Sequence, residues 1–159
     1  MDVEVVRSRK RRKTVSAQMV DGRLRVSIPA WMSKADEARH VDDMVRRMTR
    51  RREAESIDIV ERTRMLARRY DLPEPATVRF VDNQLTRWGS CTPVDRSIRL
   101  SSRLAAFPSW VLDYVIVHEL AHLVEFRHNA RFHALVARYP KTERAIGFLI
   151  AKGLDPSDD

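Results

Sequence analysis

The sequence predicts an α+β fold built from short strands followed by helices. An Asp-Gly pair at 21–22 separates a partly β-branched segment from one that alternates polar and apolar residues, which is typical of a β-hairpin. Apolar residues then recur at helical spacing between 41 and 70. Two further alternating segments, 77–81 and 97–101, precede a strongly apolar stretch at 108–124. This order of elements favours an α+β arrangement.

Length and composition predict one soluble domain. A chain of 159 residues can bury a core without cross-links. Cys91 is the only cysteine, so no internal disulfide can form, which fits a reducing compartment. The N-terminus has no secretory pattern, and no apolar run approaches the roughly 18 residues of a membrane span. We therefore expect a cytoplasmic protein with no membrane association.

The net charge of +8 comes mainly from arginine, because only five of the 30 basic residues are lysine. A positive surface of this size favours polyanionic partners such as nucleic acid, nucleotides or acidic protein segments. The alternative is an ordinary solvated face.

The first 30 residues are expected to form a small antiparallel sheet. Segments 3–6, 14–20 and 23–28 have strand character, and the basic run 7–13 would lie in a loop or at a sheet edge, where charge discourages aggregation. Nucleic-acid contact is the sharper interpretation of this run. It is weakened because no aromatic residue interleaves with these charges to stack on a base.

Residues 31–72 are expected to form linking helices. Pro29 ends the preceding strand, and Ser33 can cap a helix whose first turn contains Asp36 and Glu37. The helical pattern continues until Pro73 and Pro75 stop it. Between the later strands lies the loop 87–91, in which Gly89 permits a sharp bend or a close backbone approach. Cys91 in this loop is a small core residue or a reactive thiol.

The motif His118-Glu119-Leu120-Ala121-His122 is the central functional signal. Histidines four apart lie on one face of a helix and can reach one metal ion, whereas Glu119 lies about 100° around the helix and suits a base. Two ordinary helix histidines are the alternative. The apolar surroundings argue against it, because buried polar groups need something to bind. Tyr114, one turn earlier, contacts a ligand or packs in the core.

His128 is the expected third ligand. Six residues of continuous helix would place it about 120° away from His122, so the chain must turn near 126–127. Asn129 can cap a helix at 130–139, Pro140 separates it from a last helix that runs to about 152, and the polar tail 155–159 is expected to fray. His133 is the competing third ligand.

The segment Arg87-Trp88-Gly89-Ser90-Cys91, the segment 97–100 and the run 115–128 together resemble the YgjP-like metallopeptidase family, relatives of the SprT and Spartan proteases. The resemblance implies a zincin-like catalytic core at 73–154, joined by the linking helices to the N-terminal hairpin region in one compact unit, 1–154. It implies that one Zn²⁺ is bound by His118, His122 and His128, that Glu119 is the acid/base, and that the strand near Ile98 forms the rim for an extended peptide. His133 departs from the pattern, since relatives often carry tryptophan there.

The predicted function is zinc-dependent peptide-bond hydrolysis by a metal-activated water, with Glu119 as general base. Residues that could bind substrate or stabilise the oxyanion are Arg87, Trp88, Ile98, His133 and Tyr139. One alternative is a metal-dependent nucleotide phosphohydrolase, although no glycine-rich phosphate loop supports it. Another is a nucleic-acid-associated protease or binding module that uses the basic surface.

Overall fold

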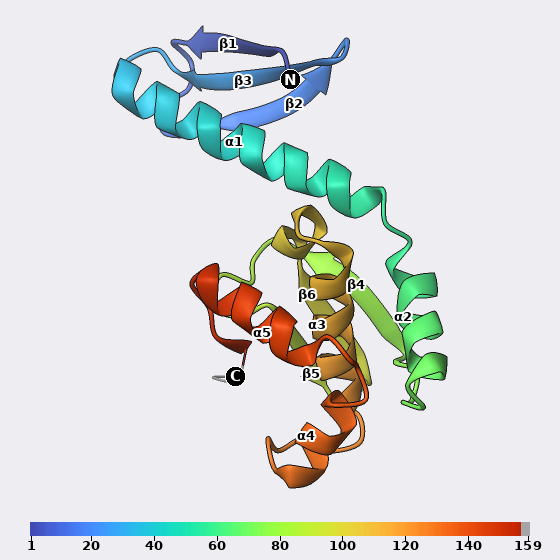
Figure 1. Ribbon diagram of the computed structural model, residues 1–159. Helices are drawn as coiled ribbons and strands as arrows, with labels where there is room; N and C mark the ends of the chain where they lie inside the picture. Colours follow the sequence, from blue (N-terminus) through green and yellow to red (C-terminus); the bar gives the residue numbers. More distant parts are fainter. Residues whose placement is uncertain (157–159) are drawn as a thin grey trace. The chain divides into compact units, whose positions relative to one another are not determined.

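The first three strands form a sheet in the N-terminal part of the chain (Figure 1). They are β1 (Val3–Ser8), β2 (Ser16–Val20) and β3 (Arg23–Pro29), in the spatial order β1-β3-β2. Strands β2 and β3 are antiparallel and are joined by Asp21 and Gly22, both at positive φ (49° and 77°). Strand β1 instead runs parallel to β3, so the sheet is mixed and the prediction of a purely antiparallel sheet was wrong.

The central place of β3 has a physical reason. Leu24, Val26 and Ile28 are fully buried on one face of β3, and a strand with such a face gains most from neighbours on both sides. Helix α1 (Lys34–Glu55) contributes partly buried residues to the same cluster, including Val41 and Met44. The backbone N–H of Asp36 donates to the Ser33 hydroxyl at 3.1 Å, as expected of the predicted cap.

The computed structural model describes residues 1–156 and divides the chain into two compact units, one of residues 1–52 and one that begins at Glu53. The expected frayed tail therefore lies partly outside the described residues. None of the helices in the described part of the chain has the length and apolar character needed to cross a membrane.

The second unit contains a three-stranded sheet with helices around it. The strands are β4 (Thr77–Val81), β5 (Gly89–Thr92) and β6 (Ser97–Ser101), in the order β4-β6-β5, with β4 parallel and β5 antiparallel to β6. The helices are α2 (Ile59–Arg69), the 3₁₀ helix η1 (Ser102–Ala106), α3 (Ser109–Ala121), α4 (Ala130–Val136) and α5 (Thr142–Ala151). The chain as described is thus α+β, as predicted.

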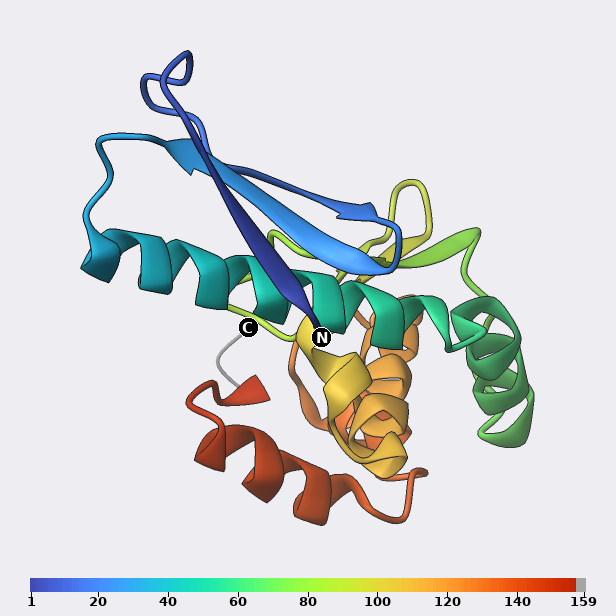
Figure 2. The same ribbon diagram turned by 90° about the horizontal axis from the view of Figure 1, so that it is seen from above.

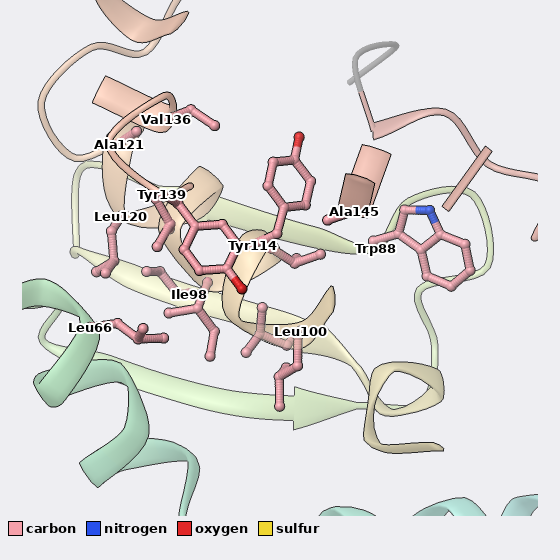
Figure 3. Close-up of a cluster of buried hydrophobic side chains, with 14 of the residues drawn as sticks. Leu66, Trp88, Ile98, Leu100, Tyr114, Leu120, Ala121, Val136, Tyr139 and Ala145 are labelled. Carbon is pink, nitrogen blue, oxygen red and sulfur yellow. The ribbon is translucent and has the colours of Figure 1, made fainter. Parts of the chain in front are cut away.

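Helix α3 is the centre of the second unit. Ten of its 13 residues are buried, and it contacts α2, α4, α5 and both β5 and β6. Figure 3 shows Leu120 and Tyr114 of α3 in one cluster with Leu66 of α2 and with Ile98 and Leu100 of β6. A helix enclosed in this way is held rigidly, which suits a site built at its end.

Helices α3 and α4 end at or before the positions that the sequence pattern predicts. Helix α3 ends at Ala121 with His122 as its C-cap, and hydrogen bonds from the backbone N–H groups of residues 123–125 continue a tight helical turn up to Glu125, so the chain leaves the helix close to the expected turn at 126–127. Helix α4 begins, as predicted, after Asn129, whose side chain accepts a hydrogen bond of 3.0 Å from the backbone N–H of Phe132. It stops at Val136 rather than at 139. The carbonyl of Val136 accepts a hydrogen bond from the Thr142 hydroxyl.

The ion pair that ties α2 to α3 gives the first prediction. Arg62 makes two contacts with Asp113, of 2.5 and 3.1 Å, and both side chains are largely screened from water. We expect Arg62→Met to lower the free energy of unfolding by about 1–3 kcal/mol, because it leaves a poorly solvated carboxylate without its partner. The control Arg64→Met removes an exposed pair with Glu61 and should cost at most about 1 kcal/mol. Urea unfolding measures both, and equal losses would contradict the assigned role of Arg62.

Candidate metal centre

The end of α3 and the turn after it bring three histidines together. His118 lies in the last turn of α3, His122 caps the helix, and His128 follows the turn. One ligand atom from each lies within 4.8 Å of the others, and Nε2 of His122 and Nε2 of His128 are 3.1 Å apart. His133, the competing ligand, is exposed and is not a member of this group. The spacing of the imidazoles is short enough for all three to reach one ion.

Burial keeps two of these imidazoles neutral. His118 is only 4% exposed, and desolvation, with smaller contributions from His122 and His128, lowers its pKa to about 3. Desolvation also lowers the pKa of His122. Because metal ligands must be deprotonated, both rings carry the lone pair that a metal needs at neutral pH.

Contacts on the far side of the rings orient them. Nδ1 of His122 lies 3.3 Å from the carbonyl oxygen of Glu125, which can only accept, so Nδ1 carries the proton and Nε2 keeps its lone pair. Nδ1 of His118 lies 3.3 Å from the hydroxyl of Tyr114, which is itself buried. Tyr114 is therefore both a core residue and a neighbour of a ligand candidate.

The remaining nitrogen of His118 tests whether a metal fits. Its Nε2 is buried and has no hydrogen-bond partner among the described residues. A buried polar atom without a partner is costly, and a metal ion would satisfy it. Three imidazoles are donors that suit zinc and its neighbours in the transition series rather than calcium or magnesium.

Phe132 is a site residue that the sequence pattern did not reveal. Its ring is stacked on His122 at a centroid distance of 4.4 Å, and it lies 4.9 Å from His118 and 4.8 Å from His128. It is fully buried and comes from the first turn of α4. One aromatic ring thus packs against all three imidazoles and restricts their rotation. The only sequence signal was its place four residues after His128.

Glu119 lies against the start of β5. It is 2% exposed, and a Cβ built on Gly89 would lie 2.7 Å from its Oε1. This is the close approach for which a glycine was expected in the loop 87–91. Glu119 does not belong to the group of convergent ligand atoms. It is positioned beside the histidines rather than among them.

A cavity of about 440 Å³ opens onto this arrangement. Its lining residues, which come from the β5 region, from the end of α3 and from the turn that follows, are Arg87, Gly89, Ser90, Cys91, Glu119, His122, Phe126, Arg127 and His128. Burial and the nearby Glu119 carboxylate raise the pKa of Cys91 to about 12. Cys91 is therefore a protonated thiol in the cavity wall, which is inconsistent with a thiolate nucleophile.

Three of the predicted substrate-binding residues are buried elsewhere. Trp88 is in the core, where its Nε1 donates to the carbonyl of Leu154 at 2.8 Å. The Tyr139 hydroxyl donates to the carbonyl of Trp110 at 2.8 Å, and Tyr139 does not line the cavity. Ile98 is fully buried in the middle strand of its sheet, so the free edge beside the site is β5 rather than the strand of Ile98. Arg87 is the predicted candidate that does line the cavity, whereas His133 lines a neighbouring hollow.

Comparison with protein families agrees with this geometry. The family model "YgjP-like, metallopeptidase domain" matches residues 12–146. The chain belongs to the YgjP-like metallopeptidase family. A YgjP-like metallopeptidase uses a metal cofactor and acts on a peptide or protein. This favours peptide hydrolysis over the phosphohydrolase alternative.

Two solved structures are similar to this YgjP-like chain. The metallopeptidase zymogen abylysin of Pyrococcus abyssi has a TM-score of 0.52 and 17% identity over 58% of this chain and 92% of its own. The metallopeptidase zymogen jannalysin of Methanocaldococcus jannaschii has a TM-score of 0.52 and 19% identity, over 60% and 97%. At this identity the similarity concerns the fold. The comparison with curated proteins gave no match.

The contact between Gly89 and Glu119 gives the second prediction. Gly89→Ala should displace the Glu119 carboxylate and reduce peptide hydrolysis on the order of 100-fold, while the metal content stays that of the wild type. Gly147→Ala is the matched control, because Gly147 lies in α5 with no atom within 4 Å of an added Cβ. The control should keep full activity. Wild-type hydrolysis by Gly89→Ala would show that the position of Glu119 is unimportant.

Proposed function

We propose that this YgjP-like metallopeptidase is a zinc enzyme that holds one ion per chain through His118, His122 and His128 and uses Glu119 as its general base. The observation that carries the proposal is the group of three convergent imidazoles, one with a buried and unpartnered Nε2, beside a carboxylate that shares their cavity. Three histidines with an open position are the ligand set of catalytic zinc sites. Structural zinc sites are usually closed by four ligands.

A zinc ion bound there would polarise the scissile carbonyl and lower the pKa of water toward 7. Glu119 would accept the proton of the attacking water and deliver it to the leaving amine, since its carboxylate lines the same cavity as His122 and His128. Gly89 leaves it room to lie close to the backbone of β5. Tyr114 and the Glu125 carbonyl would hold the first two ligands in orientation.

The substrate would be an extended peptide bound beside β5. This strand lies at the end of the order β4-β6-β5, and its residues Gly89, Ser90 and Cys91 line the cavity. Backbone hydrogen bonds to a free strand edge bind extended peptides with little dependence on sequence. Arg87 lies two residues before the start of β5 and lines the same cavity, so it is the candidate for stabilising the oxyanion. The zincin-like catalytic unit would correspond to the second compact unit of the chain, which begins at Glu53 and includes α2.

The role of Glu119 is tested by Glu119→Gln. The amide keeps the shape of the side chain but cannot accept the proton, so hydrolysis of a peptide library should fall below detection. Zinc measured by elemental analysis should remain at one ion per chain. Retained hydrolysis would exclude Glu119 as the base. Loss of both zinc and activity would show that it is a ligand instead.

The choice of the third ligand is tested by a pair of histidine variants. His128→Ala should lower zinc affinity at least 10-fold and abolish activity, since two imidazoles remain. His133→Ala is the matched control and should bind zinc as the wild type does. Competition with a chromogenic chelator measures both affinities. A larger loss in His133→Ala than in His128→Ala would overturn the assignment.

A further inference from the structure

The net positive charge of the chain lies entirely in the N-terminal unit. Residues 1–52 contain 15 lysines and arginines against 7 aspartates and glutamates, a net charge of +8, and the rest of the chain contains 15 of each. The metal centre lies in the neutral unit. A separate unit with this charge favours a polyanionic partner that is not the peptide substrate.

One continuous group of these charges is the basic loop, which we define as residues 9–13 (Arg-Lys-Arg-Arg-Lys) between β1 and β2. Within residues 1–156, none of its five cationic side chains forms an ion pair with a carboxylate. The arginines of the neighbouring strands differ, because Arg7, Arg23 and Arg25 each pair with an acidic residue. The charges of the basic loop are therefore available to phosphates.

The parallel pairing of β1 and β3 brings an aromatic residue to this loop. The last residues of the two strands, Ser8 and Pro29, are opposite each other. Both strands therefore finish at the same end of the sheet (Figure 2). The basic loop follows β1, and Trp31 follows β3. The indole Nε1 of Trp31 donates to the carbonyl of Arg12 at 2.9 Å. The aromatic residue that the linear sequence lacks beside the basic run is supplied by the fold.

Trp31 is exposed and yet held in place. Trp31 is 68% exposed to solvent, whereas Trp88 is buried in the core of the second unit. Arg7 donates to the carbonyls on both sides of it, to Ala30 at 3.0 Å and to Met32 at 2.7 Å, and also pairs with Glu37. An exposed ring whose position is fixed in advance loses little conformational entropy when a ligand stacks on it.

We propose that the N-terminal unit binds single-stranded nucleic acid, with the basic loop on the phosphates and Trp31 stacked on a base. A cationic surface beside an exposed aromatic ring is the combination that single strands require, since their bases are free to stack. An acidic peptide would satisfy the charges but offers no planar base to the indole. A duplex satisfies the charges as well, but its bases are already stacked. This activity is additional to peptide hydrolysis.

The test measures binding of the zinc-loaded full chain to a short fluorescent single-stranded oligonucleotide by anisotropy, over a range of salt concentrations. Trp31→Ala should weaken binding by about 5- to 150-fold, the effect of losing one stacked base, and Trp31→Phe should retain most of the affinity. Replacing Arg9, Lys10 and Lys13 by glutamine should reduce the slope of log K against log salt by about 2. Peptide hydrolysis should be unchanged in all of these variants.

A matched control removes the same charge from the other unit, by replacing the exposed residues Arg79, Arg99 and Lys141 with glutamine. It should leave the salt slope as in the wild type. Equal effects of the two triple variants would overturn the proposal, because they would reduce it to attraction by net charge. Wild-type affinity in Trp31→Ala, or equal affinity for a duplex or polyglutamate, would overturn it too. Because hydrolysis is measured in the same samples, failure here is distinguishable from failure of the metal centre.

Discussion

The burial of polar side chains at the end of an apolar helix is the constraint on which the second unit depends. His118 and Glu119 lie on α3 among residues that are almost all buried, and neither is solvated. Desolvation depresses the pKa of His118 and leaves its Nε2 without a protein partner. Such an arrangement is unfavourable unless the site gains a ligand. A metal ion that satisfies the unpaired nitrogen removes this unfavourable free energy, which favours metal binding.

The neighbouring elements serve this constraint in different ways. Helix α3 ends at Ala121, which lets the chain turn and return His128 to the other two imidazoles. Helix α4 then places Phe132 against all three rings, and β5 provides Gly89 where any larger residue would meet Glu119. The three convergent histidines, the Glu119 carboxylate and the strand edge thus come from segments held by the same core. This explains how a small unit can position a hydrolytic site without cross-links.

The sequence predicted those features that depend on local pattern. The spacing of His118 and His122, the cap at Asn129 and the strands at 77–81 and 97–101 follow from helical and strand periodicity. Features that depend on tertiary packing were missed or misplaced. Trp88 and Tyr139 are polar-tipped aromatics whose sequence neighbourhood suggested the site, yet their N–H and O–H groups bond to core carbonyls. The edge strand beside the cavity is β5 rather than the more apolar β6, because β6 occupies the buried centre of the sheet between β4 and β5.

The parallel pairing of β1 with β3 could not be predicted either, because the basic run between β1 and β2 reads as a simple hairpin loop. It has a consequence for function, since it places Trp31 beside charges that are 18 or more residues earlier in the chain. The two units therefore differ in chemistry as well as in charge. The second unit holds three convergent imidazoles, and the N-terminal unit presents exposed cations with a fixed aromatic ring.

The most direct measurement of the central claim is X-ray absorption spectroscopy at the zinc edge of the zinc-loaded protein. A site made by His118, His122 and His128 predicts imidazole scattering from three nitrogen ligands at about 2.0–2.1 Å and no sulfur. A sulfur ligand at about 2.3 Å would place Cys91 on the metal and contradict the three-histidine centre. Scattering from only two imidazoles would contradict it equally.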